Sequence, residues 1–136
     1  MQLVGIGTDI VQISRMQTSL DRSGERFIQR ILHPNEIKIF QNYQQRYQSS
    51  NSPAQRHIAY LAKRFAAKEA LSKALGTGIS QGVSLTEIEV YNNALGQPQL
   101  KLHGTTAQKA QKLGVKHCYL SLSDEKEYAI AYVVLT

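Results

Sequence analysis

The chain has 136 residues, of which 42% are hydrophobic, and its formal net charge is +6. This length suits one ordinary domain, 1–136, and the absence of any apolar run of about 20 residues, or of a basic segment followed by an apolar core at the N-terminus, argues against a membrane span or a signal peptide. The charge indicates acidic partners, but no Arg/Lys tract or aromatic–basic motif indicates nucleic acid.

The first predicted element is a strand near residues 2–13. Side chains alternate between the two faces of a strand, so Gly5, Gly7 and Asp9 share one face. Two glycines there leave room for another element or a ligand to approach closely. Asp9, at the end of this track, is explained equally well as a turn or helix cap or as a ligand.

Four arginines follow the strand. Arg15, Arg22, Arg26 and Arg30 are spaced 7, 4 and 4 residues apart, so they would form one basic stripe on a continuous helix, which Gly24 can interrupt. A short helix is expected from Glu25 to Leu32 and another from Pro34. A solvated face is the ordinary explanation of such a stripe.

Residues 49–53 are polar and contain proline, which predicts a linker. A long helix is expected from about Ala54 to Gly76, a glycine that suits the end of a helix. At about 100° per residue, Glu69 falls in the apolar arc of this helix and Lys73 lies at the edge of the arc. A carboxylate that faces a core needs compensation, either from Lys73 at i,i+4 or from a metal.

The second half is expected to hold strands at 85–91, 99–103, 117–123 and 128–135 and a short helix at 105–113. Thr105 suits the cap of that helix and Gly114 its end. The order of elements predicts an α+β fold, with antiparallel strands and helices packed on one side.

The single cysteine, Cys118, excludes an intrachain disulfide and fits a reducing compartment. We therefore expect a cytoplasmic protein in which Cys118 is a buried structural thiol.

Asp9 and Glu69 together offer two hard oxygen ligands from two elements. This donor set suits Mg²⁺, with waters and phosphate oxygens completing the coordination. Taken alone, Glu69 is explained better by an ordinary ion pair with Lys73.

Several segments together resemble the holo-acyl-carrier-protein synthases, the small phosphopantetheinyl transferases, over essentially the whole chain. The matching segments are Gly5–Val11, Arg64–Ile79, Ile88–Val90, Gly96–Pro98, Leu120–Ser123 and Glu127–Ala129. The resemblance implies a phosphopantetheinyl transferase fold. It implies transfer of 4′-phosphopantetheine from coenzyme A to a serine of an acyl carrier protein, with release of adenosine 3′,5′-bisphosphate, in fatty acid and lipid biosynthesis. It also implies dependence on Mg²⁺ and a homotrimer with the cofactor between subunits.

The resemblance assigns roles to particular residues. It implies that Asp9 and Glu69 bind the metal and that Glu69 and Lys73 are catalytic, with Lys73 beside the reacting phosphate. It further implies that Arg64, Lys73, Gly76, Thr77, Gly78 and Pro98 contact coenzyme A, and that Arg15, Arg22, Arg26 and Arg30 dock an acidic carrier. From pattern alone, Arg64 is equally well a solvated cation. The pattern of Gly76–Gly78 favours a helix end over a cofactor contact, and Pro98 is otherwise simply a turn residue.

Two questions stay open from the sequence. The general base is either Glu69 itself or a water held by the metal. Some relatives have an acid near the position of Lys38, but a lysine there cannot be assigned as the base. His33 and His103 have a suitable side chain for proton transfer, but lone histidines more often have structural roles.

Asp124 stands where relatives commonly have histidine, and it would repel phosphate unless Lys126 or another cation compensates. The alternative to an enzyme is a non-catalytic carrier-protein or nucleotide-binding module, supported mainly by Asp124.

Overall fold

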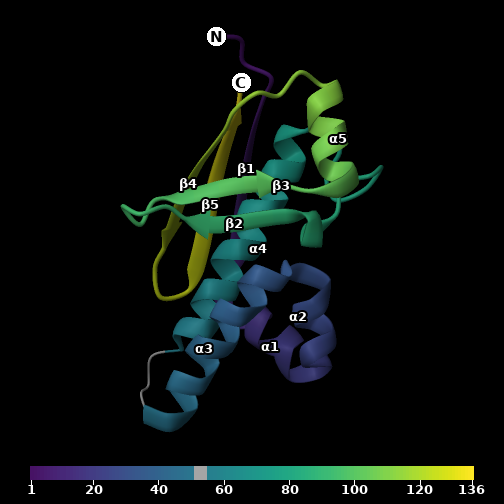
Figure 1. Cartoon of the computed structure of the whole chain (residues 1–136). Helices are drawn as coiled ribbons and strands as arrows, with labels where there is room; N and C mark the ends of the chain where they lie inside the picture. The colour runs from purple at the N-terminus through teal and green to yellow at the C-terminus, as the bar shows by residue number, and fades with distance from the viewer. Residues whose placement is uncertain (51–54) are drawn as a thin grey trace.

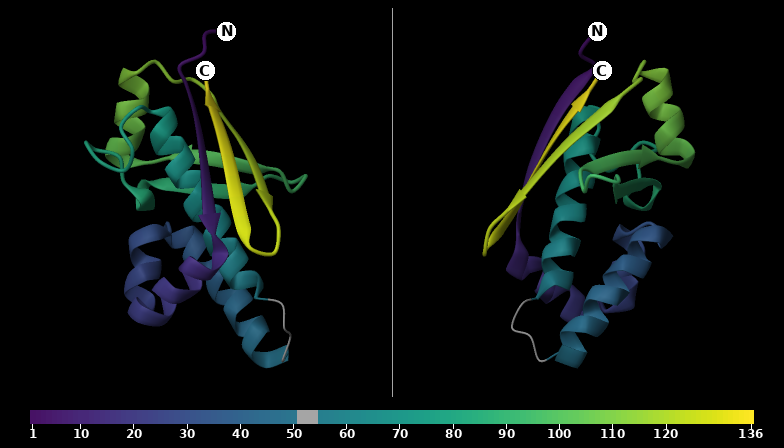
Figure 2. Two further views of the ribbon diagram at one scale, coloured as in Figure 1. Left: turned by 180° about the vertical axis from the view of Figure 1, so that it is seen from behind. Right: turned by 60° about the vertical axis from the view of Figure 1, so that its left-hand side comes forward.

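The computed structural model describes residues 1–50 and 55–136 (Figure 1). Its centre is the long helix α4 (Arg56–Ala74), which lies between a three-stranded and a two-stranded antiparallel sheet (Figure 2). Three helices gather around the N-terminal half of α4: α1 (Ile13–Ser23), α2 (Glu25–Ile31) and α3 (Pro34–Ser50). The predicted α+β fold with antiparallel strands is confirmed, with the strands divided between two sheets.

The three-stranded sheet has the order β1 (Gly5–Gln12), β5 (Tyr128–Leu135), β4 (Cys118–Asp124). The strands predicted at 117–123 and 128–135 are therefore confirmed and pair as a hairpin, and the N-terminal strand pairs with β5 along its whole length. Side chains on one face of this sheet contact α4, whereas the opposite face stays open. Cys118, at the start of β4, is a free and half-buried thiol.

Two glycines set the contact between β1 and α4. A Cβ atom at Gly5 would overlap the carbonyl oxygen of Ala74, and one at Gly7 would overlap that of Ala70. The expectation that these glycines permit close approach by another element is confirmed, and the element is α4.

Burial of α4 differs from the single apolar arc that its sequence predicts. Buried residues occur around most of the helix because sheets and helices pack against it on several sides. Glu69 is half-buried and Lys73 is exposed, one turn apart on the least covered strip of the helix. Glu69 therefore lies at the edge of the core and not inside it.

The sequence predicted that α4 ends at Gly76 and that a linker precedes it. Gly76, at φ +88°, follows the helix, and its N–H bonds to the carbonyl of Lys73, so the predicted helix end is confirmed. The helix α3 continues to Ser50, so the start of the predicted linker at 49–53 is helical. The rest of that linker falls outside the described residues.

The two-stranded sheet pairs β2 (Ile88–Asn92) with β3 (Pro98–Leu102), preceded by the short helix η1 (Leu85–Glu87) and followed by α5 (Gly104–Lys112). The prediction that Thr105 caps α5 is wrong. Burial opposes ionisation of Glu87, but hydrogen bonds from the hydroxyls and N–H groups of Thr105 and Thr106 lower its pKa to about 2. The carboxylate that holds the start of α5 thus comes from η1.

Within the described residues, the helices are too short or too polar to cross a lipid bilayer.

Candidate functional site

An acidic cluster forms where β1 meets α4. Asp9 lies within β1, paired with Ala131 of β5, so it is not a helix or turn cap. The Lys73 ammonium donates to Asp9 Oδ1 at 3.0 Å and to the carbonyl of Thr8 at 3.0 Å. The side chain of Asp9 is only 15% exposed, whereas that of Lys73 is 52% exposed. Lys73 can therefore reach a solvent-borne ligand while it holds Asp9.

Glu69 completes this cluster. Burial raises the pKa of Glu69, the Asp9 carboxylate raises it further, and the Lys73 ammonium lowers it in part. The sequence left an ion pair between Glu69 and Lys73 open, but the structure pairs Lys73 with Asp9 instead. The charge of one partly solvated ammonium thus acts on two carboxylates, of which Asp9 is its bonded partner, and an additional cation would relieve their repulsion.

The donor set of this cluster fits the implied Mg²⁺. Carboxylate oxygens from two rigid elements are the protein ligands that Mg²⁺ prefers, with waters and phosphate oxygens for its remaining positions. Asp9 and Glu69 are the residues that would hold it.

A second functional feature is a cavity of about 500 Å³ beside the N-terminal half of α4. Among the side chains that line it are Tyr60, Lys63, Arg64, Tyr91, Asn92 and Asp124. Arg64 is only 5% exposed and lies with its Cζ atom 4.2 Å above the centre of the Tyr60 ring. Burial raises the pKa of Tyr60 to about 12, although the Arg64 charge opposes this. Arg64 is therefore not a solvated cation of the helix surface.

The buried Nε atom of Arg64 has no hydrogen-bond partner within the described residues. Buried polar groups normally have one, and a guanidinium is suited to phosphate oxygens. Arg64 lines the cavity, so an anion bound there would be able to contact its guanidinium group.

Asp124 lies in the same cavity, where Lys63 of α4 pairs with it at 3.7 Å. The compensating cation is thus Lys63 and not Lys126. Pro98 is the register partner of Asn92, which also lines the cavity, so the start of β3 lies beside this cavity.

Gly76, Thr77 and Gly78 form a turn directly after α4, near Lys73 in the chain. The N–H groups of Thr77 and Gly78 bond to the carbonyl of Ser72. This is the helix end that their pattern favours, at the C-terminus of α4, whereas Arg64 lies near the middle of the helix.

The four candidate docking arginines do not lie on one continuous helix. Gly24, at φ +54° and ψ −132°, separates α1, with Arg15 and Arg22, from α2, with Arg26 and Arg30. All four side chains are exposed, so they present positive charge from two successive helices.

Sequence reasoning missed a buried ion pair that supports the site. Lys68 and Glu36 are 0% and 1% exposed, with Lys68 Nζ 2.5 Å from Glu36 Oε1. Lys68 also donates to the carbonyls of Ile31 and Leu85, and Glu36 accepts the N–H groups of His33 and Val90. Lys68 could have been recognised from the sequence, because it lies in an apolar, alanine-rich part of the helix, where a charged residue needs a partner.

Comparison with known proteins identifies relatives over nearly the whole chain. Residues 5–133 match the family model described as the 4′-phosphopantetheinyl transferase superfamily. A holo-[acyl-carrier-protein] synthase of Halorhodospira halophila is 51% identical over 133 residues, which cover 98% of this chain and 97% of that protein.

Solved structures show the same fold. The holo-[acyl-carrier-protein] synthase of Neisseria meningitidis has a TM-score of 0.84 and 36% identity, covering 99% of both chains. A holo-(acyl-carrier-protein) synthase of Bacillus anthracis, in complex with CoA (3′,5′-ADP), has a TM-score of 0.75 and 38% identity, covering 98% of this chain and 96% of that one.

Proposed function

We propose that this chain, which belongs to the holo-acyl-carrier-protein synthases of the 4′-phosphopantetheinyl transferase superfamily, transfers 4′-phosphopantetheine from coenzyme A to a serine of an acyl carrier protein in a Mg²⁺-dependent reaction. The other product is adenosine 3′,5′-bisphosphate. The observation that carries the proposal is that one helix, α4, holds both Glu69 and Lys73, which meet Asp9 of β1, and the buried, incompletely bonded Arg64.

The reaction forms a bond between the serine oxygen and the phosphorus that bears pantetheine, and it breaks the pyrophosphate bond to the nucleotide. The serine hydroxyl proton leaves to a base, either Glu69 or a water. Charge on the phosphates must be neutralised and the serine held in line. When bound at Asp9 and Glu69, Mg²⁺ supplies charge neutralisation at phosphoryl oxygens. Lys73 adds a point charge beside the reacting phosphate. The guanidinium of Arg64 binds a nucleotide phosphate in the cavity, and the turns at Gly76–Gly78 and Pro98 complete the contacts with coenzyme A.

The direct test combines the chain with coenzyme A, Mg²⁺ and an apo-acyl carrier protein. Mass spectrometry should show a phosphopantetheine on the carrier serine, together with release of adenosine 3′,5′-bisphosphate. Binding of both partners without modification of the carrier would favour a non-catalytic module. Asp124 gives that alternative less support once Lys63 is seen to pair with it.

Asp124→His is expected to tighten coenzyme A several-fold, because it removes a carboxylate from the cavity that holds Arg64 and adds a group that can donate to phosphate. The gain should be smaller for dephospho-coenzyme A, which lacks the 3′-phosphate. Calorimetric titration of both ligands into wild type and variant gives the affinity ratio. An equal gain for the two ligands would place Asp124 away from the 3′-phosphate.

The arginines of α1 and α2 are proposed to dock the acidic carrier. Arg26→Glu should raise the KM for the carrier about tenfold or more while the KM for coenzyme A changes little, and the effect should shrink in high salt. Lys112→Glu makes the same charge change on α5 and serves as the control. Equal losses for both substrates would instead assign Arg26 to the active site or to folding.

A homotrimer is proposed because the open face of the three-stranded sheet is apolar. The large exposed side chains of this face are Ile6, Ile10, Tyr119, Tyr128, Ile130 and Tyr132, each at least 36% exposed. Contiguous apolar patches of this kind mark interfaces. The occupant that we propose is further copies of this chain, three in all by analogy with the family.

Light scattering at assay concentration should report three chains, and Ile130→Lys at the centre of this face should yield smaller species with reduced activity. Leu95→Lys places the same charge at an 84% exposed leucine on the turn between β2 and β3 and should leave the trimer intact. A fully active wild-type monomer would contradict the proposal. We also assign the enzyme to the cytoplasm, in keeping with its one free thiol.

A further inference from the structure

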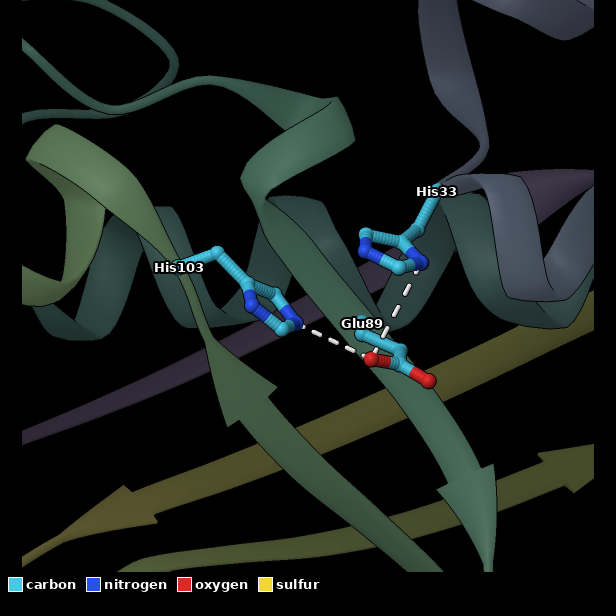
Figure 3. Close-up of side chains that lie close together, drawn as sticks. All are labelled: His33, Glu89 and His103. Atoms are coloured by element: carbon cyan, nitrogen blue, oxygen red, sulfur yellow. Dashed lines mark hydrogen bonds and ion pairs between the residues drawn. The ribbon is translucent and has the colours of Figure 1, made fainter.

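His33, Glu89 and His103 converge from three separate segments (Figure 3). His33 lies in the connection between α2 and α3, Glu89 lies in β2, and His103 follows β3 directly. Glu89 Oε1 is 3.8 Å from His33 Nδ1 and 2.9 Å from His103 Nε2. The three ligand atoms all lie within 4.8 Å of one another.

We propose that this cluster binds a divalent transition-metal ion of the zinc class. Two imidazoles and a carboxylate form a donor set that zinc uses in proteins, and imidazole nitrogen also suits cobalt, nickel and copper. Bond lengths of about 2.0–2.2 Å in a tetrahedral site place neighbouring ligand atoms about 3.3 Å apart. The separations of Glu89 Oε1 from His103 Nε2 and His33 Nδ1, 2.9 and 3.8 Å, lie on either side of that value.

The contact between His33 and Glu89 gives the position of the proposed cation. The Asn35 backbone N–H donates to His33 Nδ1 at 3.1 Å, which makes this nitrogen an acceptor in the arrangement seen. Glu89 Oε1 is also an acceptor, so two electron-rich atoms face each other at 3.8 Å without a proton between them. A metal ion at this position would bind both atoms and would replace the bond from Asn35 to His33 and the bond from His103 to Glu89.

The surroundings of Glu89 orient it for this role. The side chain of Glu89 is 10% exposed, and the Asn35 amide donates to its Oε2 atom at 3.1 Å, so Oε1 is left to the two histidines. Such bonds to a ligating carboxylate are the usual support of a metal site.

The histidines themselves are accessible to an ion from solution, with side chains 18% and 32% exposed for His33 and His103. Their rings stack nearly parallel, 4.6 Å between centroids at 18°. A shared ion therefore requires each ring to turn about its Cβ–Cγ bond.

The proposed ion differs from Mg²⁺ in chemistry and in place. Its ligands include two nitrogens, which Mg²⁺ does not favour. They also belong to the two-stranded sheet and the α2–α3 connection, whereas Asp9 lies in the three-stranded sheet across α4 (Figure 2). A bound ion would join the α2–α3 connection to β2 and β3 and would stabilise the native chain by mass action.

The test is a titration of the full chain with Co²⁺, in excess Mg²⁺ to occupy oxygen sites. We expect visible d–d absorption from one Co²⁺ per chain, displaced by Zn²⁺, and a rise in the melting temperature. His33→Gln and His103→Gln should each weaken binding at least tenfold. His117→Gln removes an exposed histidine outside the cluster and should leave the affinity unchanged.

Two results would overturn the proposal. One is that about millimolar Co²⁺ gives no d–d absorption above that of the free ion. The other is that neither His33→Gln nor His103→Gln weakens Co²⁺ binding relative to His117→Gln. Should either variant fail to fold, imidazole nitrogen NMR of the wild type decides: resonances of both His33 and His103 that do not shift with Zn²⁺ exclude the site. Transferase activity is not a readout, so these outcomes are independent of the proposed reaction.

Discussion

Asp9→Asn and Glu69→Gln are each expected to lower the rate of phosphopantetheine transfer by at least about a hundredfold while the protein stays folded. Each change removes one anionic ligand from the cluster at β1 and α4, and charge stabilisation at phosphoryl oxygens contributes several kcal/mol. Both changes should also weaken Mg²⁺ binding. The measurements are single-turnover transfer to an apo-carrier and calorimetric titration with Mg²⁺.

Glu127→Gln is a suitable control because it neutralises an exposed carboxylate on the turn between β4 and β5. Circular dichroism of each variant separates loss of chemistry from loss of structure. If both folded variants turn over and respond to Mg²⁺ like the wild type, Asp9 and Glu69 are not the ligands.

Lys68→Met is expected to lower the free energy of unfolding by about 3–5 kcal/mol, because it leaves the Glu36 carboxylate buried without its cation. Glu36 is 1% exposed, and its remaining hydrogen bonds come from the backbone of His33 and Val90. Urea unfolding of the variant measures the change. The variant should lose stability but keep its transferase activity under conditions where it remains folded.

Lys63→Met gives a matched comparison on the same helix. Lys63 also pairs with an acid, Asp124, but at 3.7 Å and with both side chains at least 30% exposed. An exposed pair contributes about 0–1 kcal/mol, so this variant should unfold close to the wild type. If Lys68→Met and Lys63→Met lowered the free energy of unfolding by similar amounts, the buried pair would contribute no more to stability than the exposed pair.

Much of the fold followed from local sequence signals. The alternation in β1 and the two glycines predicted a strand with room beside it, and α4 occupies that room. Prediction was wrong where a distant residue took a local role: Thr105 was expected to cap α5, but Glu87, 18 residues earlier, accepts the N–H groups at its start. No pattern within α5 reports such a partner.

The candidate site was predictable to a similar degree. Asp9 and Glu69 were singled out as acids on strand and helix faces, and burial and then the Asp9 carboxylate raise the pKa of Glu69. The burial of Arg64 was not foreseen, because one helix period cannot show that α4 is covered from several sides. The meeting of His33 with His103 depends on how β3 lies beside the α2–α3 connection, which no spacing in the chain encodes.

The overlap that a Cβ atom would create at Gly7 has a consequence for how this protein can diverge. Because the backbones of β1 and α4 touch there, the position of Asp9 relative to Glu69 is set by main-chain contact two residues away. Elsewhere in the core, a larger side chain at one position can be compensated by a smaller one beside it. No such compensation is possible at Gly7, because the neighbouring atoms are backbone. Even the methyl group of an alanine at Gly7 would push β1 away from α4. Substitution of Gly7 is therefore not tolerated as long as Asp9 and Glu69 must bind the same ligand.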